Sequence, residues 1–157
     1  MSDFIYMTRE RYLEIEKELN DLKVRGRKEI AQKIADARAH GDLSENAEYD
    51  AAKEEQGLLE LKISKLESML SRAKIIGTNN ISTDEVRVLT KVKVKNLKTG
   101  KELTYHLVSP EEADFENGKL SVNSPIGRQL LGKKVGDTVK VTVPAGVIEF
   151  QVLEIMK

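Results

Sequence analysis

The sequence predicts an α+β protein in two parts, an N-terminal helical hairpin followed by a small mixed domain. All three prolines lie after Gly77, and proline is poorly tolerated inside helices. Apolar residues recur every three or four positions before Gly77, which is the helical period, and every second position in stretches after it, which is the strand period. We therefore divide the chain into residues 1–77 and 78–157, with residues 78–84 as a linker.

The first helix is expected to run from an N-cap at Thr8 to about Ala39. Its apolar stripe consists of Tyr12, Ile15, Leu19, Leu22, Ile30, Ile34 and Ala37. Gly26 falls on the same stripe, where a side chain would be expected. A glycine there permits a close approach of the partner helix or a bend.

The second helix is expected from about Leu43 to Ala73. Its stripe consists of Ala52, Leu59, Ile63, Leu66, Leu70 and Ala73. Two apolar stripes of matched length that are joined by a short turn predict an antiparallel coiled-coil hairpin. The turn, at residues 40–44, would form its free tip.

Alternating apolar residues predict two β-hairpins in the second half: 92–94 with 103–107, and 139–143 with 148–152. A short helix is expected between them. Ser124 would be its N-cap and Pro125 its first residue, and Gly132 would end it. The second half thus reads as a small α+β domain with its own core.

Composition excludes several classes of function. Basic and acidic residues are equal in number, 26 of each, and this balance argues against autonomous binding of duplex DNA, whose affinity comes largely from phosphate neutralisation. The chain has no cysteine, which excludes disulfides and thiolate metal sites. The N-terminus lacks the pattern of a secretory signal and no apolar run reaches about 18 residues. We expect a cytoplasmic protein without membrane contact.

Three carboxylates lie three residues apart at the predicted tip: Asp42, Glu45 and Glu48. Spacing alone leaves two interpretations open. Asp42 and Glu45 suit an N-cap and a capping box for the second helix. They also suit Mg²⁺, which usually takes only one or two protein carboxylates. Two carboxylates bind magnesium weakly, so the second interpretation requires another macromolecule to supply the remaining ligands.

The segment 37–53, ARAHGDLSENAEYDAAK, resembles the tip signature of the GreA/GreB family of bacterial transcript cleavage factors, and of its GreA branch in particular. The similarity extends to Met7–Thr8, to EADF at 112–115 and to SVNSPI at 121–126. The resemblance implies that the hairpin enters the secondary channel of RNA polymerase. There it would stimulate the polymerase's own cleavage of nascent RNA in backtracked, arrested complexes, after which elongation resumes.

The resemblance also implies residue roles. Asp42 and Glu45 match the family's catalytic acids, which help to hold the second Mg²⁺ of the polymerase active site. The factor by itself would be no enzyme and would bind no cofactor. Arg38 and Lys53 match a small basic patch near the RNA 3′ end, although by sequence alone they are more typical of exposed helix charges. The slight acidic excess of the first half fits the GreA branch.

The second domain resembles the family's C-terminal module, which has an FKBP-like fold. We interpret it as the part that docks on the polymerase, with candidate contacts at Ser121, Asn123, Ser124 and Pro125. The same residues suit the capping of the short helix. The family expectation is a monomer.

Three other functions stay open. An inhibitory relative would occupy the same channel, but the presence of both acids argues against it. A proline isomerase would act through the second domain, whose few aromatic residues speak against a proline pocket; aromatic content is 4% in the whole chain. A plain coiled-coil adaptor would use the acids as helix caps only.

Overall fold

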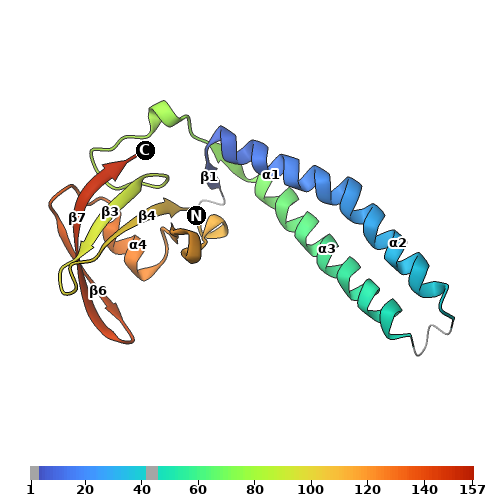
Figure 1. Cartoon of the computed structure of the whole chain (residues 1–157). Helices are drawn as coiled ribbons and strands as arrows, with labels where there is room; N and C mark the ends of the chain where they lie inside the picture. The colour runs from blue at the N-terminus through green and yellow to red at the C-terminus, as the bar shows by residue number, and fades with distance from the viewer. Residues whose placement is uncertain (1–3, 42–45) are drawn as a thin grey trace. The chain divides into compact units, whose positions relative to one another are not determined.

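The computed structural model describes residues 4–41 and 46–157, which form two compact units (Figure 1). One unit is Glu10–Arg72; the other combines the residues through Arg9 with Ala73–Lys157. The predicted combination of a helical hairpin and a mixed α+β domain is confirmed. The units divide the chain after Arg9 and after Arg72, whereas the sequence predicts one boundary at Gly77. The FKBP likeness of the second unit stays a prediction.

The described part of the hairpin contains these helical segments: α1 (Arg9–Asp21), η1 (Leu22–Gly26), α2 (Arg27–Arg38) and α3 (Ala47–Ser71). The first three follow one another without a break, which confirms the predicted first helix. The second helix begins at Ala47, so the predicted start at Leu43 is wrong. It also ends at Ser71, because Ala73 belongs to a strand. Within the described ranges, no helix is both long and apolar enough to span a membrane.

The predicted stripes are confirmed in part: six of their members are buried and the others are half-buried. The buried apolar residues of the hairpin are Ile15, Ile30, Ala37, Ala52, Ile63, Leu66 and Met69; Met69 was not on the predicted stripe. Gly26 ends the π-helical segment η1, where each turn holds more residues than in an α-helix. A Cβ at Gly26 would lie 3.3 Å from Leu59 Cδ1, so the predicted close approach at this glycine is confirmed.

Ion pairs cross between the two sides of the hairpin. Arg27 binds Glu60 with two hydrogen bonds of 2.8 and 3.0 Å, and Lys33 Nζ lies 3.0 Å from Glu55 Oε2. These residues are exposed, and an exposed pair contributes little to stability. Their pairing shows that the two helices run antiparallel.

A five-stranded sheet with the order β5-β4-β3-β7-β6 forms most of the second unit. Its strands are β3 (Lys91–Asn96), β4 (Glu102–Val108), β5 (Lys119–Ser121), β6 (Thr138–Val143) and β7 (Gly146–Met156). Both predicted β-hairpins are confirmed: Val92 pairs with Tyr105 and Val139 with Phe150. Strand β5, parallel to β4, was not predicted.

The short helix α4 (Pro125–Leu130) packs against the sheet (Figure 1). Leu130 is fully buried, and Gly132 follows the helix with a φ of +81°, as the predicted stop requires. Together they close a core that consists of Val86, Val92, Val94, Tyr105, Leu107, Leu120, Leu130, Val139, Val141, Phe150, Val152 and Ile155.

The second unit also contains a small parallel sheet of β1 (Ile5–Met7) and β2 (Ala73–Ile75). Ile5 and Met7 are almost completely buried. The backbone N–H of Tyr6 donates to Ser109 Oγ at 3.0 Å, just before the 3₁₀ turn η3 (Pro110–Glu112). These contacts explain why the first residues of the chain group with its C-terminal half.

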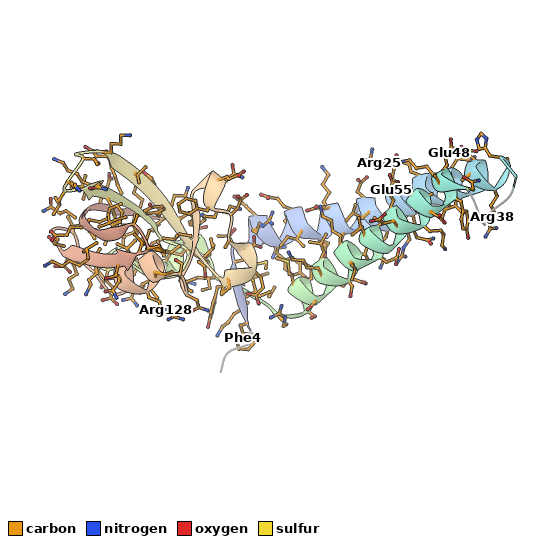
Figure 2. All side chains as sticks on the ribbon, turned by 90° about the horizontal axis from the view of Figure 1, so that it is seen from below. Phe4, Arg25, Arg38, Glu48, Glu55 and Arg128 are labelled. Atoms are coloured by element: carbon orange, nitrogen blue, oxygen red, sulfur yellow. The ribbon has the colours of Figure 1, made fainter. Side chains whose placement is uncertain are left out.

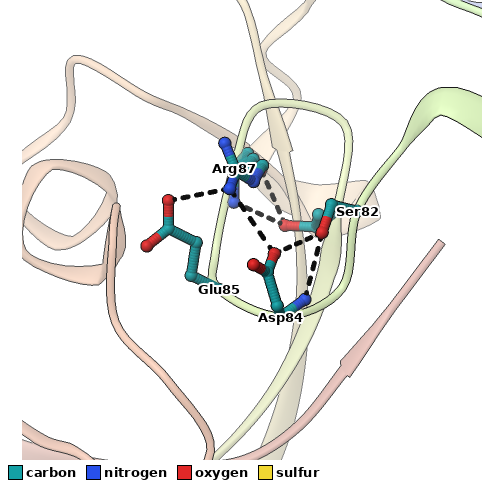
Figure 3. Close-up of polar contacts among 5 residues, drawn as sticks. Ser82, Asp84, Glu85 and Arg87 are labelled. Carbon is teal, nitrogen blue, oxygen red and sulfur yellow. Dashed lines mark hydrogen bonds and ion pairs between the residues drawn. The ribbon is translucent and has the colours of Figure 1, made fainter.

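The predicted linker leads from the 3₁₀ turn η2 (Thr78–Asn80) into a polar cluster (Figure 3). Ser82 donates its hydroxyl hydrogen to Asp84 Oδ1, and this bond, assisted by the charge of Arg87, lowers the pKa of Asp84. Arg87 Nη2 lies 3.5 Å from Asp84 Oδ1 and 3.1 Å from Glu85 Oε1. The end of the linker is therefore tied down by side-chain contacts.

Candidate functional site at the turn of the hairpin

The predicted acids Asp42 and Glu45 lie outside the described residues. The residues on either side of them are described: residues 39–41 follow α2, and Asn46 precedes α3. Figure 2 shows Arg38 and Glu48 at this end of the hairpin.

The side chain of Asn46 makes hydrogen bonds to both helices at the turn. Its backbone is extended, its Oδ1 accepts a 3.0 Å hydrogen bond from the N–H of Tyr49, and it is the N-cap of α3. Its Nδ2 donates a 2.6 Å hydrogen bond to the carbonyl oxygen of Ala37, near the end of α2. We call this second hydrogen bond, from Asn46 Nδ2 to Ala37 O, the Asn46 bridge. Because Asn46 caps α3, the predicted use of Asp42 as the N-cap of that helix is wrong.

Two further contacts cross the turn. The guanidinium of Arg38 lies 6.0 Å from the centre of the half-buried Tyr49 ring, within the range of a cation–π interaction. His40 Nε2 lies 3.3 Å from Glu48 Oε2, and both side chains are largely exposed. The first turn of α3 thus meets the last residues of α2 through aromatic and charged groups as well as through the Asn46 bridge.

The two candidate basic residues are both exposed and both have neighbours. Arg38 contacts Tyr49 across the turn, whereas Lys53 Nζ donates a 2.8 Å hydrogen bond to Gln56 Oε1 within α3. Neither contact buries the charge. Both side chains stay accessible to a negatively charged partner, and their role as an RNA-facing patch stays a prediction.

The candidate docking residues form a compact turn before α4. Ser124 Oγ accepts from the N–H of Gly127 at 3.1 Å and donates to the carbonyl of Ser121 at 2.7 Å. Ser121 Oγ in turn accepts from the N–H of Asn123 at 3.0 Å. The capping interpretation of this motif is confirmed. Asn123 and Pro125 are exposed, so capping leaves them available for a partner.

Gly127 is a residue of this turn that the sequence analysis missed. A Cβ at this position would lie 2.1 Å from the carbonyl oxygen of Ser121, much closer than atoms can approach. The signal was a glycine inside a helix of six residues, where glycine is unfavourable unless close packing requires it.

No cluster of three or more histidine, aspartate or glutamate side chains suited to a metal ion occurs in the part of the chain that the structure describes.

The turn sequence and the two-unit fold can be compared with known proteins. Residues 5–75 match the family described as "Transcription elongation factor, N-terminal" and residues 81–157 match "Transcription elongation factor, GreA/GreB, C-term". The chain belongs to the GreA/GreB family. The resemblance inferred from the sequence is confirmed.

Its relatives in the GreA/GreB family are similar over their full length. Transcription elongation factor GreA of Chlorobium phaeobacteroides (strain BS1) is 54% identical over 157 residues, which cover 99% of this chain and 98% of the relative. GreA of Chloroherpeton thalassium is 52% identical, with 99% and 98% covered. Among solved structures, Gfh1 of Thermus aquaticus is 30% identical with a TM-score of 0.47, covering 99% of this chain and all of that one (100%).

Proposed function

We propose that this chain binds RNA polymerase through the secondary channel and stimulates the polymerase's own endonucleolytic cleavage of nascent RNA in backtracked, arrested complexes. Membership of a family of transcription elongation factors supports this function. The chain is then an accessory factor rather than an enzyme, and it works in the cytoplasm beside the polymerase.

The observation that carries the proposal is the N-cap of α3. Since Asn46 caps that helix, capping does not account for the carboxylates of Asp42 and Glu45, and we propose that they act as ligands. Two hard oxygen donors suit Mg²⁺ but do not complete its shell. We propose that they help to hold the second Mg²⁺ of the polymerase active site, which activates water and stabilises charge on the phosphate. The chain alone would bind no cofactor.

The other contacts follow from exposure and charge. Arg38 and Lys53 would face the RNA 3′ end inside the complex, where two cations favour a phosphate backbone. Asn123 and Pro125 would contact the polymerase, held in place by the hydrogen bonds of Ser121 and Ser124. The chain would act as a monomer. Its zero net charge gives no basis for binding duplex DNA on its own.

The test uses stalled, backtracked elongation complexes with Mg²⁺ and labelled RNA, to which the full-length factor is added. Wild type is compared with Asp42→Asn and Glu45→Gln, which keep the side-chain size and remove the charge. Asp50→Asn is the matched control, because it removes an exposed carboxylate from the first turn of α3. Wild type and Asp50→Asn should shorten the RNA, and the other two variants should be slower by about a hundredfold.

Two outcomes would contradict the proposal. Equal cleavage by all four proteins would show that Asp42 and Glu45 have no catalytic role. Binding of wild type to the polymerase without any stimulation of cleavage would instead indicate an inhibitory factor that occupies the same channel.

A further inference from the structure

We infer that Asn46 is a positioning residue, whose side-chain amide holds the end of α2 against the start of α3 and thereby fixes the two ends of the turn. This inference rests on the proposed function, because the turn between these ends carries Asp42 and Glu45 in the sequence. Asn46 itself would touch neither RNA nor metal.

The contacts of Asn46 use both ends of its amide. The oxygen accepts from Tyr49 N at 3.0 Å and the nitrogen donates to Ala37 O at 2.6 Å. Ala37 O also accepts from the N–H of His40 at 3.1 Å, so both of its lone pairs are used. The side chains of Ala37 and Ala52 are buried. Small residues let the two helices come close at this end, within reach of one short side chain.

The choice of asparagine at position 46 distinguishes the bond to Ala37 from simple capping of α3. Serine, threonine and aspartate cap helices about as well as asparagine. Only asparagine, among these, offers a carbonyl acceptor and an N–H donor on the same short side chain. Aspartate lacks the donor when ionised, and serine lacks the second polar atom. The capping of α3 alone therefore does not require asparagine at position 46, whereas the bond to Ala37 does.

The rate of cleavage depends on the position of the reacting groups to within about 1 Å. A displacement of about 1 Å can reduce a rate by about a hundredfold. Without the bridge, α3 would still have a cap and the helices would still pack, but the ends of the turn would lose the hydrogen bond from Asn46 to Ala37. Loss of the bridge should therefore reduce the rate of cleavage at saturating factor and leave binding to the polymerase unchanged.

Asn46→Ser is the decisive variant, because it keeps a capping oxygen and removes the donor to Ala37. Gln32→Ala is the matched control: it removes an exposed side-chain amide that donates to Asp36 within α2, at 2.8 Å. In the backtracked-complex assay, Asn46→Ser should lower the maximal cleavage rate by about tenfold to a hundredfold. The factor concentration at half-maximal rate and the helical circular dichroism should match wild type. Gln32→Ala should match wild type in all three measurements.

A second measurement needs no polymerase. The chain contains no cysteine, so Ala39→Cys together with Ala47→Cys places two spin labels across the turn, both at exposed positions. Their distance distribution should be narrow in the wild-type background and broader with Asn46→Ser. It should stay narrow with Gln32→Ala.

The results separate this inference from the proposed function. If wild type cleaves and Asn46→Ser cleaves equally fast with an unchanged label distance, the positioning role is wrong and the proposed function stands. If Asn46→Ser broadens the distance but cleaves at the wild-type rate, the bridge exists without catalytic importance, and the inference is again wrong. If wild type does not stimulate cleavage, the proposed function is wrong, and the catalytic role of the Asn46 bridge is wrong with it.

Discussion

Gly127 is the glycine at which an added methyl group would come closest to a neighbouring atom. Its missing Cβ would stand 2.1 Å from the carbonyl oxygen of Ser121, which is backbone and cannot rotate away. Gly127→Ala should therefore displace α4 and destabilise the second unit by roughly 3 kcal/mol. Urea unfolding monitored through amide hydrogen exchange in β4 and β7 would measure the change in the free energy of unfolding of the second unit alone.

Gly57 provides the matched control for that substitution. It also lies inside a helix, but nothing is within 4 Å of its Cβ position. Gly57→Ala should stabilise α3 by about 1 kcal/mol, because alanine is the better helix former. If both substitutions changed stability in the same direction, the argument from close packing at Gly127 would fail.

His106 should make the second unit sensitive to acid. Burial, and then the nearby charges of Lys91 and Lys119, lower the pKa of this imidazole below its ordinary value of 6.5. Below pH 6.5 the unfolded chain therefore binds more protons at this position than the folded chain does, and the folded state loses stability as the pH falls. Well above that pH the imidazole is neutral in both states and the effect disappears.

The test is the pH dependence of unfolding of wild type and His106→Gln. The stability of wild type should fall more steeply between pH 7 and 5 than that of the variant. The chain has 2 histidines, so one substitution assigns both imidazoles in an NMR titration. A midpoint for His106 at or above 6.5 would contradict the predicted direction.

At the scale of elements, ion pairs across the hairpin should help to fix its register. Arg27 and Glu60 form the best of them, with two short hydrogen bonds that raise the pKa of Arg27 and lower the pKa of Glu60. Arg27→Glu or Glu60→Arg alone should lower the melting temperature of the hairpin by a few degrees at most. The double exchange should restore most of the loss, and added salt should reduce all differences. Independent, additive effects of the two exchanges would show that the pair does not interact.

The sequence predicted long elements well and short ones poorly. The stripes that contain Ile15, Ile30 and Ile63 run over many turns, so their period is unmistakable. Strands β1, β2 and β5 have three residues each, too few for an alternation to stand out. The start of α3 was misplaced because Asp42 and Asn46 are both good N-caps in sequence. The hydrogen bond that Asn46 Oδ1 accepts from Tyr49 N–H identifies Asn46 as the cap.

At the scale of the whole molecule, the sequence did not predict that the first strand would join the second unit. Ile5 pairs with Ala73, and the entire hairpin separates these residues in the sequence. The spacing of apolar residues along the chain does not predict contacts between such distant residues. The candidate acids were recognised from the resemblance of the turn sequence, since their spacing alone favours a cap. The bridge from Asn46 to Ala37 likewise depends on the helices meeting in space.

The two units should carry separable functions, docking in one and chemistry at the turn of the other. Asp42→Asn, with its second unit intact, should therefore compete with wild type for the polymerase. An excess of this variant should suppress RNA cleavage by wild-type factor in proportion to its concentration. Gly127→Ala combined with Asp42→Asn should compete poorly, because the turn before α4 that holds Asn123 and Pro125 is displaced.

A titration of each variant into a fixed mixture of wild-type factor and backtracked complexes would measure this competition. Asp42→Asn should halve the cleavage rate at about the concentration of wild type itself, because both proteins bind through the same second unit. If Asp42→Asn failed to compete, the carboxylate would be needed for binding as well as for chemistry, and the division of labour between the units would be wrong. If the double variant competed as well as the single one, docking would not depend on the turn before α4, and the hairpin would be the main source of affinity for the polymerase.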